Sequence, residues 1–342
     1  DFQRDPRFTV TALFAPEHAL HGRAGPGERV ESGRDPATGL PVYSLYGETR
    51  KPTRAMLEGL DALVFDIQDV GARYYTYVWT MALAMQAAAE HGLLFVVLDR
   101  PNPIGGELVQ GNVLDPAFAT FVGLYPVPMR HGLTAGELAR LLNGEHGIGA
   151  RLVVVPVEGW RRSMWYDETG LPWTPPSPNM PSLESAAHYP GTCLFEGTNL
   201  SVGRGSDSAY QQIGAPWLAH EELARRLSGF GLPGVRFEPV VFTPREPADG
   251  KYAGQVVRGV RFVMTDRRSY DPTRAAVAAL VEIQRLHPDR LEWRVSHFDR
   301  LAGTDRLRTQ VVAGATLEAI TAPWAAQLAS FGKVREKYLL YR

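Results

Sequence analysis

Residues 61–77, DALVFDIQDVGARYYTY, decide how this chain folds. The apolar run 62–65 is short enough for a β-strand that is buried on both faces. Asp66, Asp69 and Gly71 interrupt this run, and a tyrosine-rich segment follows them. A buried strand that ends in acids, a glycine and tyrosines is typical of a ligand site at the strand tip, because such residues pack a core poorly.

The same order of elements repeats outward from this stretch. We expect a helix at about 77–91, a second buried strand at 93–98, and a helix that begins at Thr134 with a capping box to Glu137. A further strand is expected at 151–157. The order strand, helix, strand, helix, strand predicts a parallel sheet covered by helices.

At 342 residues the chain is long enough for two domains. The pattern changes near residue 216, after which a helix, two strand-like runs at 235–242 and 256–264, and a second helix predict an α+β unit. We therefore expect a larger α/β domain over residues 1–215 and a smaller α+β domain over residues 216–342.

Composition excludes several classes of function. With 36 basic and 37 acidic residues, the chain has no positive excess that would suit nucleic acid or an anionic membrane. Its one cysteine, Cys193, excludes an intrachain disulfide and a multi-cysteine metal site, and apolar neighbours predict a buried, inert thiol. The apolar helix candidate 77–89 is shorter than the ~20 residues that a membrane span needs. The chain starts at Asp1 without a methionine or a signal peptide, so we expect a processed or trimmed start and read no compartment from it.

Acidic side chains follow the predicted strands. In parallel sheets, ligands bind beyond the carboxyl ends of the strands. Glu17 and His18 follow the first predicted strand, 8–14, so Glu17 is a candidate proton donor to a leaving group, while a surface or capping role stays open. A metal site with His18, His21 and an aspartate is a weaker hypothesis, because the spacing matches no strong metal motif.

Asp66 and Asp69 form a second acidic pair, around the turn at Gly71. Paired acids serve glycoside hydrolysis, in which one acts as the acid and the other as base or nucleophile. The same two residues equally suit hydrogen bonds to the turn or an ion pair with Arg73. Tyr74 and the tyrosines that follow it either stack on a sugar ring or pack in the core.

A glycine-rich loop that begins at Glu196 is the third polar segment. It also carries Asn199 and Arg204, which suit contacts to a sugar or carboxylate and equally suit a hydrogen-bonded structural loop. Arg130 and His131 are similarly placed, just before the capped helix. The sequence has no nucleophile elbow and no phosphate-binding P-loop, so neither of those chemistries is supported.

Ordered motifs occur along nearly the whole chain. They are FAPEH (14–18), DIQDVGARYYTY (66–77), DRPNP (99–103), RHG (130–132), PSPNMP (176–181), EGTN (196–199), GAPW (214–217) and YLLY (338–341). Together they resemble the DUF1343 family, the NamZ-type exo-β-N-acetylmuramidases. The resemblance implies a Rossmann-like, mostly parallel sheet with helices on both faces, a smaller C-terminal α+β domain and an active site in the cleft between them. It also implies release of terminal N-acetylmuramic acid from the non-reducing end of peptidoglycan fragments, in cell-wall turnover and recycling.

The resemblance further implies roles for single residues. Glu17 is the implied catalytic acid, and Asp66, Asp69 and Glu196 are candidates for the second carboxyl group. Residues implied to bind substrate are His18, Arg73, Tyr74, Arg100, Asn102, Arg130, His131, Asn179, Asn199 and Arg204. One of the arginines in this set is expected to bind the lactyl carboxylate of muramic acid, because a guanidinium binds carboxylates in a bidentate way. No metal or cofactor is implied, and the expected partners are muropeptides or disaccharides that contain N-acetylmuramic acid, in an extracytoplasmic location.

Two departures from the family pattern bear on function. Ala19 and His21 stand where glycine and arginine are typical, which is expected to change the affinity for the lactyl group. Family members usually carry an upstream strand-and-helix unit with a Thr-Asn-Pro motif, which this sequence does not show. A sheet without its first strand, with an exposed edge, is therefore expected.

Three functional hypotheses stay open at this point. The first is a metal-independent glycosidase with two carboxyl groups in an interdomain cleft. The second is a muropeptide-binding module without catalysis, favoured by Ala19, His21 and the missing unit. The third is a metal-dependent hydrolase with ligands from His18, His21 and Asp66.

Overall fold

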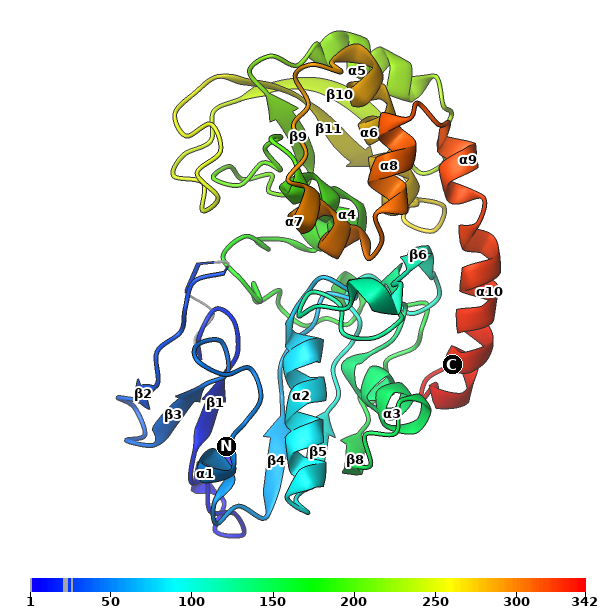
Figure 1. Ribbon diagram of the computed structural model, residues 1–342. Helices are drawn as coiled ribbons and strands as arrows, with labels where there is room; N and C mark the ends of the chain where they lie inside the picture. Colours follow the sequence, from blue (N-terminus) through cyan, green and yellow to red (C-terminus); the bar gives the residue numbers. More distant parts are fainter. Residues whose placement is uncertain (1, 21–23, 26) are drawn as a thin grey trace.

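The computed structural model describes residues 2–20, 24–25 and 27–342. Two units lie one above the other in Figure 1, and both termini lie on the lower unit. The lower unit contains a central sheet, a small side sheet and the hairpin-like pair β6 (Gln110–Val113) and β7 (Pro128–Arg130), which is antiparallel. No helix in the described part of the chain is long and apolar enough to cross a membrane.

The central sheet consists of the parallel strands β4 (Ala62–Phe65), β5 (Leu94–Leu98) and β8 (Arg151–Val155), in that order. The helix α2 (Tyr77–Glu90) connects β4 to β5, and α3 (Ala135–Glu145) precedes β8. The predicted alternation of strands and helices and the α/β fold class are therefore confirmed. β4 forms one edge of this sheet.

Local signals in the sequence set the end of α2 and the start of α3. After α2, Gly92 has a φ of 69°, the left-handed conformation that ends helices and that glycine adopts without strain. Before α3, the Thr134 hydroxyl oxygen accepts a hydrogen bond from the Glu137 N–H, and the Glu137 carboxylate accepts one from the Thr134 N–H. This is the predicted capping box.

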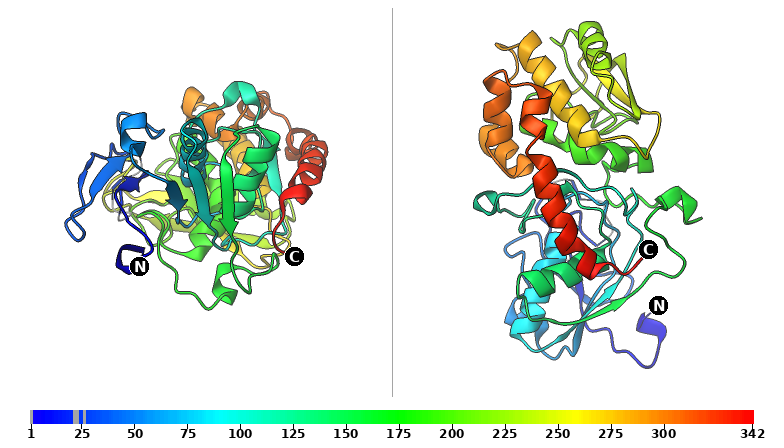
Figure 2. Two further views of the ribbon diagram at one scale, coloured as in Figure 1. Left: turned by 90° about the horizontal axis from the view of Figure 1, so that it is seen from below. Right: turned by 90° about the vertical axis from the view of Figure 1, so that its right-hand side faces the viewer.

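The two faces of the central sheet have different environments. Phe65, Phe95 and Val97 are buried on the face that α2 and α3 cover side by side. On the opposite face, Val64 and Val153 are 49% and 45% exposed. Among the described residues this second face is open, and Figure 2 shows both helices on the same side of the strands, so the expected helices cover one face of the sheet and not both.

The side sheet has the order β1 (Leu13–Ala15), β3 (Pro41–Ser44) and β2 (Gly33–Arg34). β1 is parallel to β3, and β2 is antiparallel to it. The predicted strand 8–14 was wrong at its start, because only Leu13–Ala15 finds a paired neighbour, whereas the large side chain of Phe8 is 49% exposed. The first strand also lies in this sheet and not beside β4.

The upper unit is built on an antiparallel sheet of β10 (Val235–Phe242), β11 (Val257–Met264) and β9 (Gln212–Ala215). The remaining helices of the described chain are α1 (Arg54–Leu57), α4 (Leu183–Thr192), α5 (His220–Ser228), α6 (Pro272–Leu286), α7 (Val295–Ala302), α8 (Arg306–Val312), α9 (Leu317–Thr321) and α10 (Trp324–Arg335), with 3-10 helices at Phe2–Arg4, Pro116–Phe118, Tyr166–Glu168, Cys193–Gly197 and Glu336–Tyr338. Because α4 packs on α6 and β9 pairs with β11, contacts of the upper unit begin before residue 215. The division of the chain at residue 215 into two domains stays a prediction.

The C-terminal tail returns to the lower unit. α10 runs down the outside of the molecule, and the chain ends beside α3 (Figure 1, Figure 2). The Tyr341 hydroxyl donates a hydrogen bond of 2.6 Å to Asp99, and the Leu340 N–H donates one of 2.8 Å to Glu137. The tail therefore connects the upper unit to the lower one at Asp99 and Glu137.

Candidate active site

Glu17 lies in the loop after β1 and is buried. One carboxylate oxygen accepts a hydrogen bond of 2.8 Å from the Gly27 N–H, and the other accepts one of 2.6 Å from the Thr76 hydroxyl. Thr76 immediately precedes α2, so the carboxylate lies at the positive end of that helix. Sequence reasoning missed Thr76, although its position directly before a helix was a usable signal.

The backbone that follows Glu17 is strained. His18 and Ala19 have φ values of 68° and 61°, in the left-handed region that side chains other than glycine rarely adopt. The His18 Nδ1 lies 2.8 Å from the Ala24 carbonyl oxygen, and its ring meets the edge of Tyr77 at 6.3 Å between centroids. Two consecutive left-handed residues turn the chain sharply, which directs Glu17 inward while His18 packs behind it. His21 lies outside the described residues.

Asp69 lies in the loop after β4 and is also buried. One carboxylate oxygen, Oδ2, accepts a hydrogen bond of 2.7 Å from the Gly71 N–H. Gly71 has a φ of 79°, and a Cβ there would lie 2.4 Å from the side-chain oxygen of Asn102. The turn that orients Asp69 therefore needs glycine at this position.

His131 faces Asp69 from the end of β7. Its Nε2 lies 3.7 Å from Asp69 Oδ2. Its Nδ1 accepts a hydrogen bond from the Leu133 N–H, so in the neutral ring the proton resides on Nε2 and points toward Asp69. In the described part of the chain, Asp69 Oδ1 and His131 Nε2 are buried without a hydrogen-bond partner. Such atoms are rare in folded proteins, and a ligand or an ordered water satisfies them.

A pair of tyrosines lies within reach of the charges of both Glu17 and Asp69. The rings of Tyr75 and Tyr77 meet edge to face at 5.0 Å. Burial raises the pKa of both phenols, and the negative charges of Glu17 and Asp69 raise it further. Burial and then the charge of Glu17 also raise the pKa of Tyr46, to about 12. The phenols of Tyr75 and Tyr77 therefore stay protonated; the Tyr77 hydroxyl already donates to the Pro176 carbonyl oxygen at 2.6 Å, and the buried Tyr75 hydroxyl has no hydrogen-bond partner among the described residues.

The structure places Asp66 outside this group. Its carboxylate pairs with Arg100, at 2.7 Å from Nη2 and 2.9 Å from Nε, and the two side chains are 47% and 41% exposed. Asp66 and Asp69 follow the same strand three residues apart, but only Asp69 turns into the interior. The Arg100 guanidinium is therefore already paired with a carboxylate of the protein.

Glu196 belongs to the upper unit and forms a buried ion pair. It accepts hydrogen bonds of 2.5 Å from both Arg204 and the Tyr210 hydroxyl. Burial by itself would raise the pKa of Glu196, but the charge of Arg204 and these hydrogen bonds hold it below its ordinary value. A carboxylate held in its ionised form in this way suits a structural role. The Nε and Nη1 of Arg204 have no partner among the described residues.

Arg73 and Tyr74, predicted to bind substrate, are core residues. Arg73 is fully buried, and its guanidinium donates hydrogen bonds of 2.8–3.0 Å to the backbone oxygens of Asn112, Val127, Leu301 and Ala302. The Tyr74 hydroxyl donates to the Pro190 carbonyl oxygen. Backbone oxygens accept from both Nη atoms of Arg73 and from the Tyr74 hydroxyl, so these donors are not available to a substrate, whereas the buried Nε of Arg73 has no partner among the described residues.

The three predicted asparagines have different surroundings. The side-chain amide of Asn102 donates to the Leu133 oxygen and accepts from the Ile104 N–H. The side-chain amide of Asn199 likewise donates to the Arg290 carbonyl oxygen and accepts from the Glu292 N–H. Both amides stabilise loops. Asn179 is half-buried in the turn that follows Ser177, and Ser177 approaches Tyr75.

The described residues contain no group of three or more His, Cys, Asp and Glu side chains placed to hold a metal ion. Of the ligands that the metal hypothesis needs, Asp66 pairs with Arg100, and His21 lies outside the described residues. Cys193 is buried as predicted, and burial raises the pKa of its thiol well above the ordinary value.

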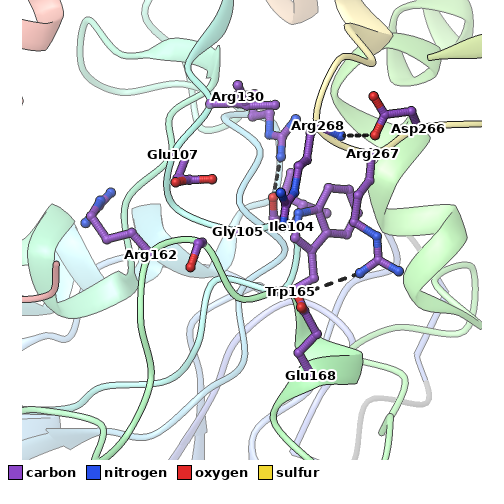
Figure 3. Close-up of a pocket in the computed structure, with 12 residues that line it drawn as sticks. Ile104, Gly105, Glu107, Arg130, Arg162, Trp165, Glu168, Asp266, Arg267 and Arg268 are labelled. Atoms are coloured by element: carbon purple, nitrogen blue, oxygen red, sulfur yellow. Dashed lines mark hydrogen bonds and ion pairs between the residues drawn. The ribbon is translucent and has the colours of Figure 1, made fainter.

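A pocket of about 410 Å³ opens at a separate place, between the two units (Figure 3). Arg130, the neighbour of His131, lines it, together with the loop 104–108, residues from 162 to 168 and the turn 266–268. Successive residues of an extended chain point to opposite sides. The end of β7 thus directs Arg130 into this pocket and His131 toward Asp69.

Comparison with known proteins gives concordant matches over the whole chain. A family model described as exo-beta-N-acetylmuramidase NamZ, N-terminal, matches residues 1–184, and the corresponding C-terminal model matches residues 187–341. Peptidoglycan beta-N-acetylmuramidase NamZ of Bacillus subtilis strain 168 is 47% identical over 338 residues, which cover 98% of this chain and 81% of that protein.

Two solved structures share the fold. The DUF1343 family protein BF0371 from Bacteroides fragilis NCTC 9343 superposes with a TM-score of 0.93 and 37% identity, over 100% of this chain and 88% of that one. A second protein of the same organism, BF0379, has a TM-score of 0.75 and 32% identity, over 98% of this chain and 87% of that one.

Proposed function

The chain belongs to the NamZ family of exo-β-N-acetylmuramidases, and from this premise we propose that it releases terminal N-acetylmuramic acid from the non-reducing end of peptidoglycan fragments. It is a glycoside hydrolase in this proposal, with muropeptides or disaccharides that contain N-acetylmuramic acid as substrates. Its action outside the cytoplasm, where the polymer lies, is part of the same proposal.

One observation carries the proposal. Two buried carboxylates, Glu17 and Asp69, lie near the same pair of protonated tyrosines, and Asp69 Oδ1 and His131 Nε2 face the site without a protein partner. Glycosidases need two carboxyl groups around one sugar-sized space, with an oxocarbenium-like transition state between them. Unsatisfied buried acceptors and donors are what hydroxyl groups of a sugar satisfy.

We assign the acid role to Glu17 and the second carboxyl role to Asp69. Glu17 is held from both oxygens by Gly27 and Thr76, so its carboxyl group has a fixed position from which to protonate the glycosidic oxygen. Asp69 keeps Oδ1 free, whereas its Oδ2 accepts from the Gly71 N–H and lies 3.7 Å from His131 Nε2. Its negative charge is placed to stabilise the positive charge that develops on the sugar ring or to activate water.

The test is an assay with a chromogenic N-acetylmuraminide, run with and without a chelator. We expect release that survives chelation and that falls by about 10²–10⁴-fold in Glu17→Gln and in Asp69→Asn, the range typical of general acid–base groups. Asp66→Asn is the matched control, because this exposed aspartate follows the same strand and pairs only with Arg100.

Other outcomes separate the alternatives. Tight binding of the muraminide without release in the wild type would leave a binding module. Release that a chelator abolishes would indicate a metal-dependent hydrolase. Equal losses in Asp66→Asn and Asp69→Asn would contradict the assignment of the second carboxyl role. Far-UV circular dichroism of each variant checks that the fold is retained.

A further inference from the structure

The pocket between the two units has a buried cation, Arg130, with no carboxylate at ion-pair distance among the described residues, although Asp271 is near enough for its charge to act on it. Arg130 is 2% exposed, and its guanidinium donates to the Gln110 side chain at 2.9 Å and to the Ile104 carbonyl oxygen, both of which are neutral. Within the described chain it forms no ion pair, and its Nε is buried without a hydrogen-bond partner. A buried charge of this kind is costly unless an opposite charge compensates it.

Some of the other charged side chains that line the pocket form ion pairs or hydrogen bonds, and others do not. Arg267 forms two hydrogen bonds of 2.8 Å to Asp167, and Arg162 pairs with Glu137 at 2.7 Å. Glu168 and Asp266, which also line the pocket, accept hydrogen bonds from nearby backbone N–H groups. By contrast, the side chains of Arg268 and Glu107 have no ion-pair or hydrogen-bond partner in the part of the chain that the structure describes.

The free groups have an ordered arrangement. In the view of Figure 3, Arg130, Arg268 and Trp165 are drawn close to one another, and Glu107 is drawn apart from them. Two guanidinium groups lie over the Trp165 ring, at centroid distances of 5.5 Å for Arg130 and 4.9 Å for Arg267. The pocket thus offers two cations and a flat aromatic surface at one side and an unpaired carboxylate at the other.

We propose that this pocket binds a small zwitterionic ligand, a free amino acid or short peptide, with its carboxylate on Arg130 and Arg268 and its ammonium group on Glu107. The volume of about 410 Å³ lies within the range of roughly 300–1,000 Å³ that is usual for small-molecule sites. A guanidinium pair matches a carboxylate well. A phosphate fits less well, because Glu107, Glu168 and Asp266 on the walls repel a group with more than one negative charge.

This inference goes beyond the muramidase activity and does not depend on it. The pocket lies on the other side of the β7 end from Asp69, since Arg130 and His131 point in opposite directions. A peptide that is still attached to muramic acid through its amino end has no free ammonium group for Glu107. Because the pocket requires a free ammonium group, it is expected to bind a released peptide and not the peptide stem of an intact muropeptide.

The test is isothermal titration calorimetry of the full chain with alanyl-alanine, its N-acetylated form and inorganic phosphate. We expect binding of the free dipeptide, weakened at least tenfold by N-acetylation, by Arg268→Gln and by Glu107→Gln. Glu107→Gln should leave the weak binding of the acetylated form unchanged. Arg236→Gln, which removes an exposed arginine of the upper unit, and Glu17→Gln should bind the dipeptide as the wild type does.

The proposal would be overturned if the dipeptide gave no heat of binding, or if Arg268→Gln and Glu107→Gln left its binding unchanged. It would also be overturned if Glu17→Gln removed the binding, or if phosphate bound more tightly than the dipeptide. Arg268 and Glu107 are exposed, so their variants are expected to fold, whereas the buried Arg130 is left intact in this test. Because the readout is binding, a wild type without muramidase activity would not affect the outcome.

Discussion

His131 points its Nε2 at Asp69 Oδ2 across 3.7 Å, a separation too long for a hydrogen bond. The Nδ1 of His131 is fixed by the Leu133 N–H, and Asp69 by the Gly71 N–H. Both side chains are therefore oriented by the backbone and not by each other. The gap between them is preformed for a group that donates to the carboxylate and accepts from the imidazole, such as a sugar hydroxyl.

This geometry predicts unequal effects of the two side chains on catalysis. Asp69→Asn should lower kcat by about 10²–10⁴-fold, because it removes charge beside the reacting carbon. His131→Ala should cost about tenfold in kcat/KM, the worth of one hydrogen bond to a buried charged or polar group. Steady-state kinetics on the chromogenic muraminide measure both. If His131→Ala proved as damaging as Asp69→Asn, the imidazole would have a direct part in proton transfer.

Exchange of Ala19 for glycine is expected to stabilise the fold, whereas alanine-to-glycine exchanges usually destabilise it. An L-residue in the left-handed region costs roughly 1–2 kcal/mol, so Ala19→Gly should stabilise the fold by up to about 1 kcal/mol despite the greater chain entropy of glycine. Ala326→Gly is the matched control, because Ala326 is exposed in the helix α10 and the same exchange there should destabilise by about 1 kcal/mol. Thermal denaturation compares the two, and loss of stability in Ala19→Gly would contradict the strain argument.

The fold was predictable where its signals are local. The strand before Asp66, the helix after it and the capping box at Thr134 all depend on residues within one or two turns of each other. The first strand was placed wrongly, because the sequence does not show that β3 is the only neighbour of Leu13–Ala15 in the described chain. Pairing partners that lie far apart in sequence determine such boundaries.

The site was predictable only in part for the same reason. Glu17, Asp69 and His131 were predicted from strand ends and motifs; the structure places Asp69 3.7 Å from His131, and the charges of Glu17 and Asp69 both act on Tyr75 and Tyr77. Asp66 has the same chemistry as Asp69, yet Arg100 holds it at the surface. Sequence patterns identify which residue types follow a strand, but they do not reveal the distant partner that engages each side chain. The roles of these residues stay predictions.

Arg73 gives a prediction about how the units hold together. Its Nη2 donates to the carbonyl oxygens of Leu301 and Ala302, at the end of α7 in the upper unit, and its Nη1 donates to oxygens of the lower unit. Arg73→Met should destabilise the protein by about 3–5 kcal/mol, because buried acceptors lose their donors. Arg73→Lys should recover little of this, since an ammonium group cannot reach both sets of oxygens.

Urea denaturation followed by tryptophan fluorescence measures this effect. A single transition shifted to lower urea is expected if the units unfold together, and two separate transitions if Arg73 provides most of their coupling. Arg300→Met is a suitable control, because its guanidinium lies on the exposed surface of α7 and bonds only within that helix. A stability of Arg73→Met equal to that of the wild type would show that the four hydrogen bonds are energetically neutral.

The Glu196–Arg204 pair predicts a pH dependence of stability. The pKa of Glu196 is lower in the folded protein than its ordinary value of 4.5, so the folded state binds fewer protons than the unfolded state just below that pH. The stabilisation by the charged pair is therefore fully present above about pH 4.5 and is lost as the pH falls through the lowered pKa. Glu196→Gln, which keeps the shape and an acceptor for Tyr210, removes this contribution at neutral pH.

Comparing the free energy of unfolding of the wild type and of Glu196→Gln across pH tests whether folding lowers or raises the pKa of Glu196. The difference in the free energy of unfolding should be constant from pH 7 to about pH 5 and shrink toward zero at lower pH. Glu58→Gln is the control, because that carboxylate is exposed and forms no ion pair with another described residue. A difference that grows on acidification would mean that the folded state stabilises the protonated form of Glu196, contrary to the direction derived from its partners.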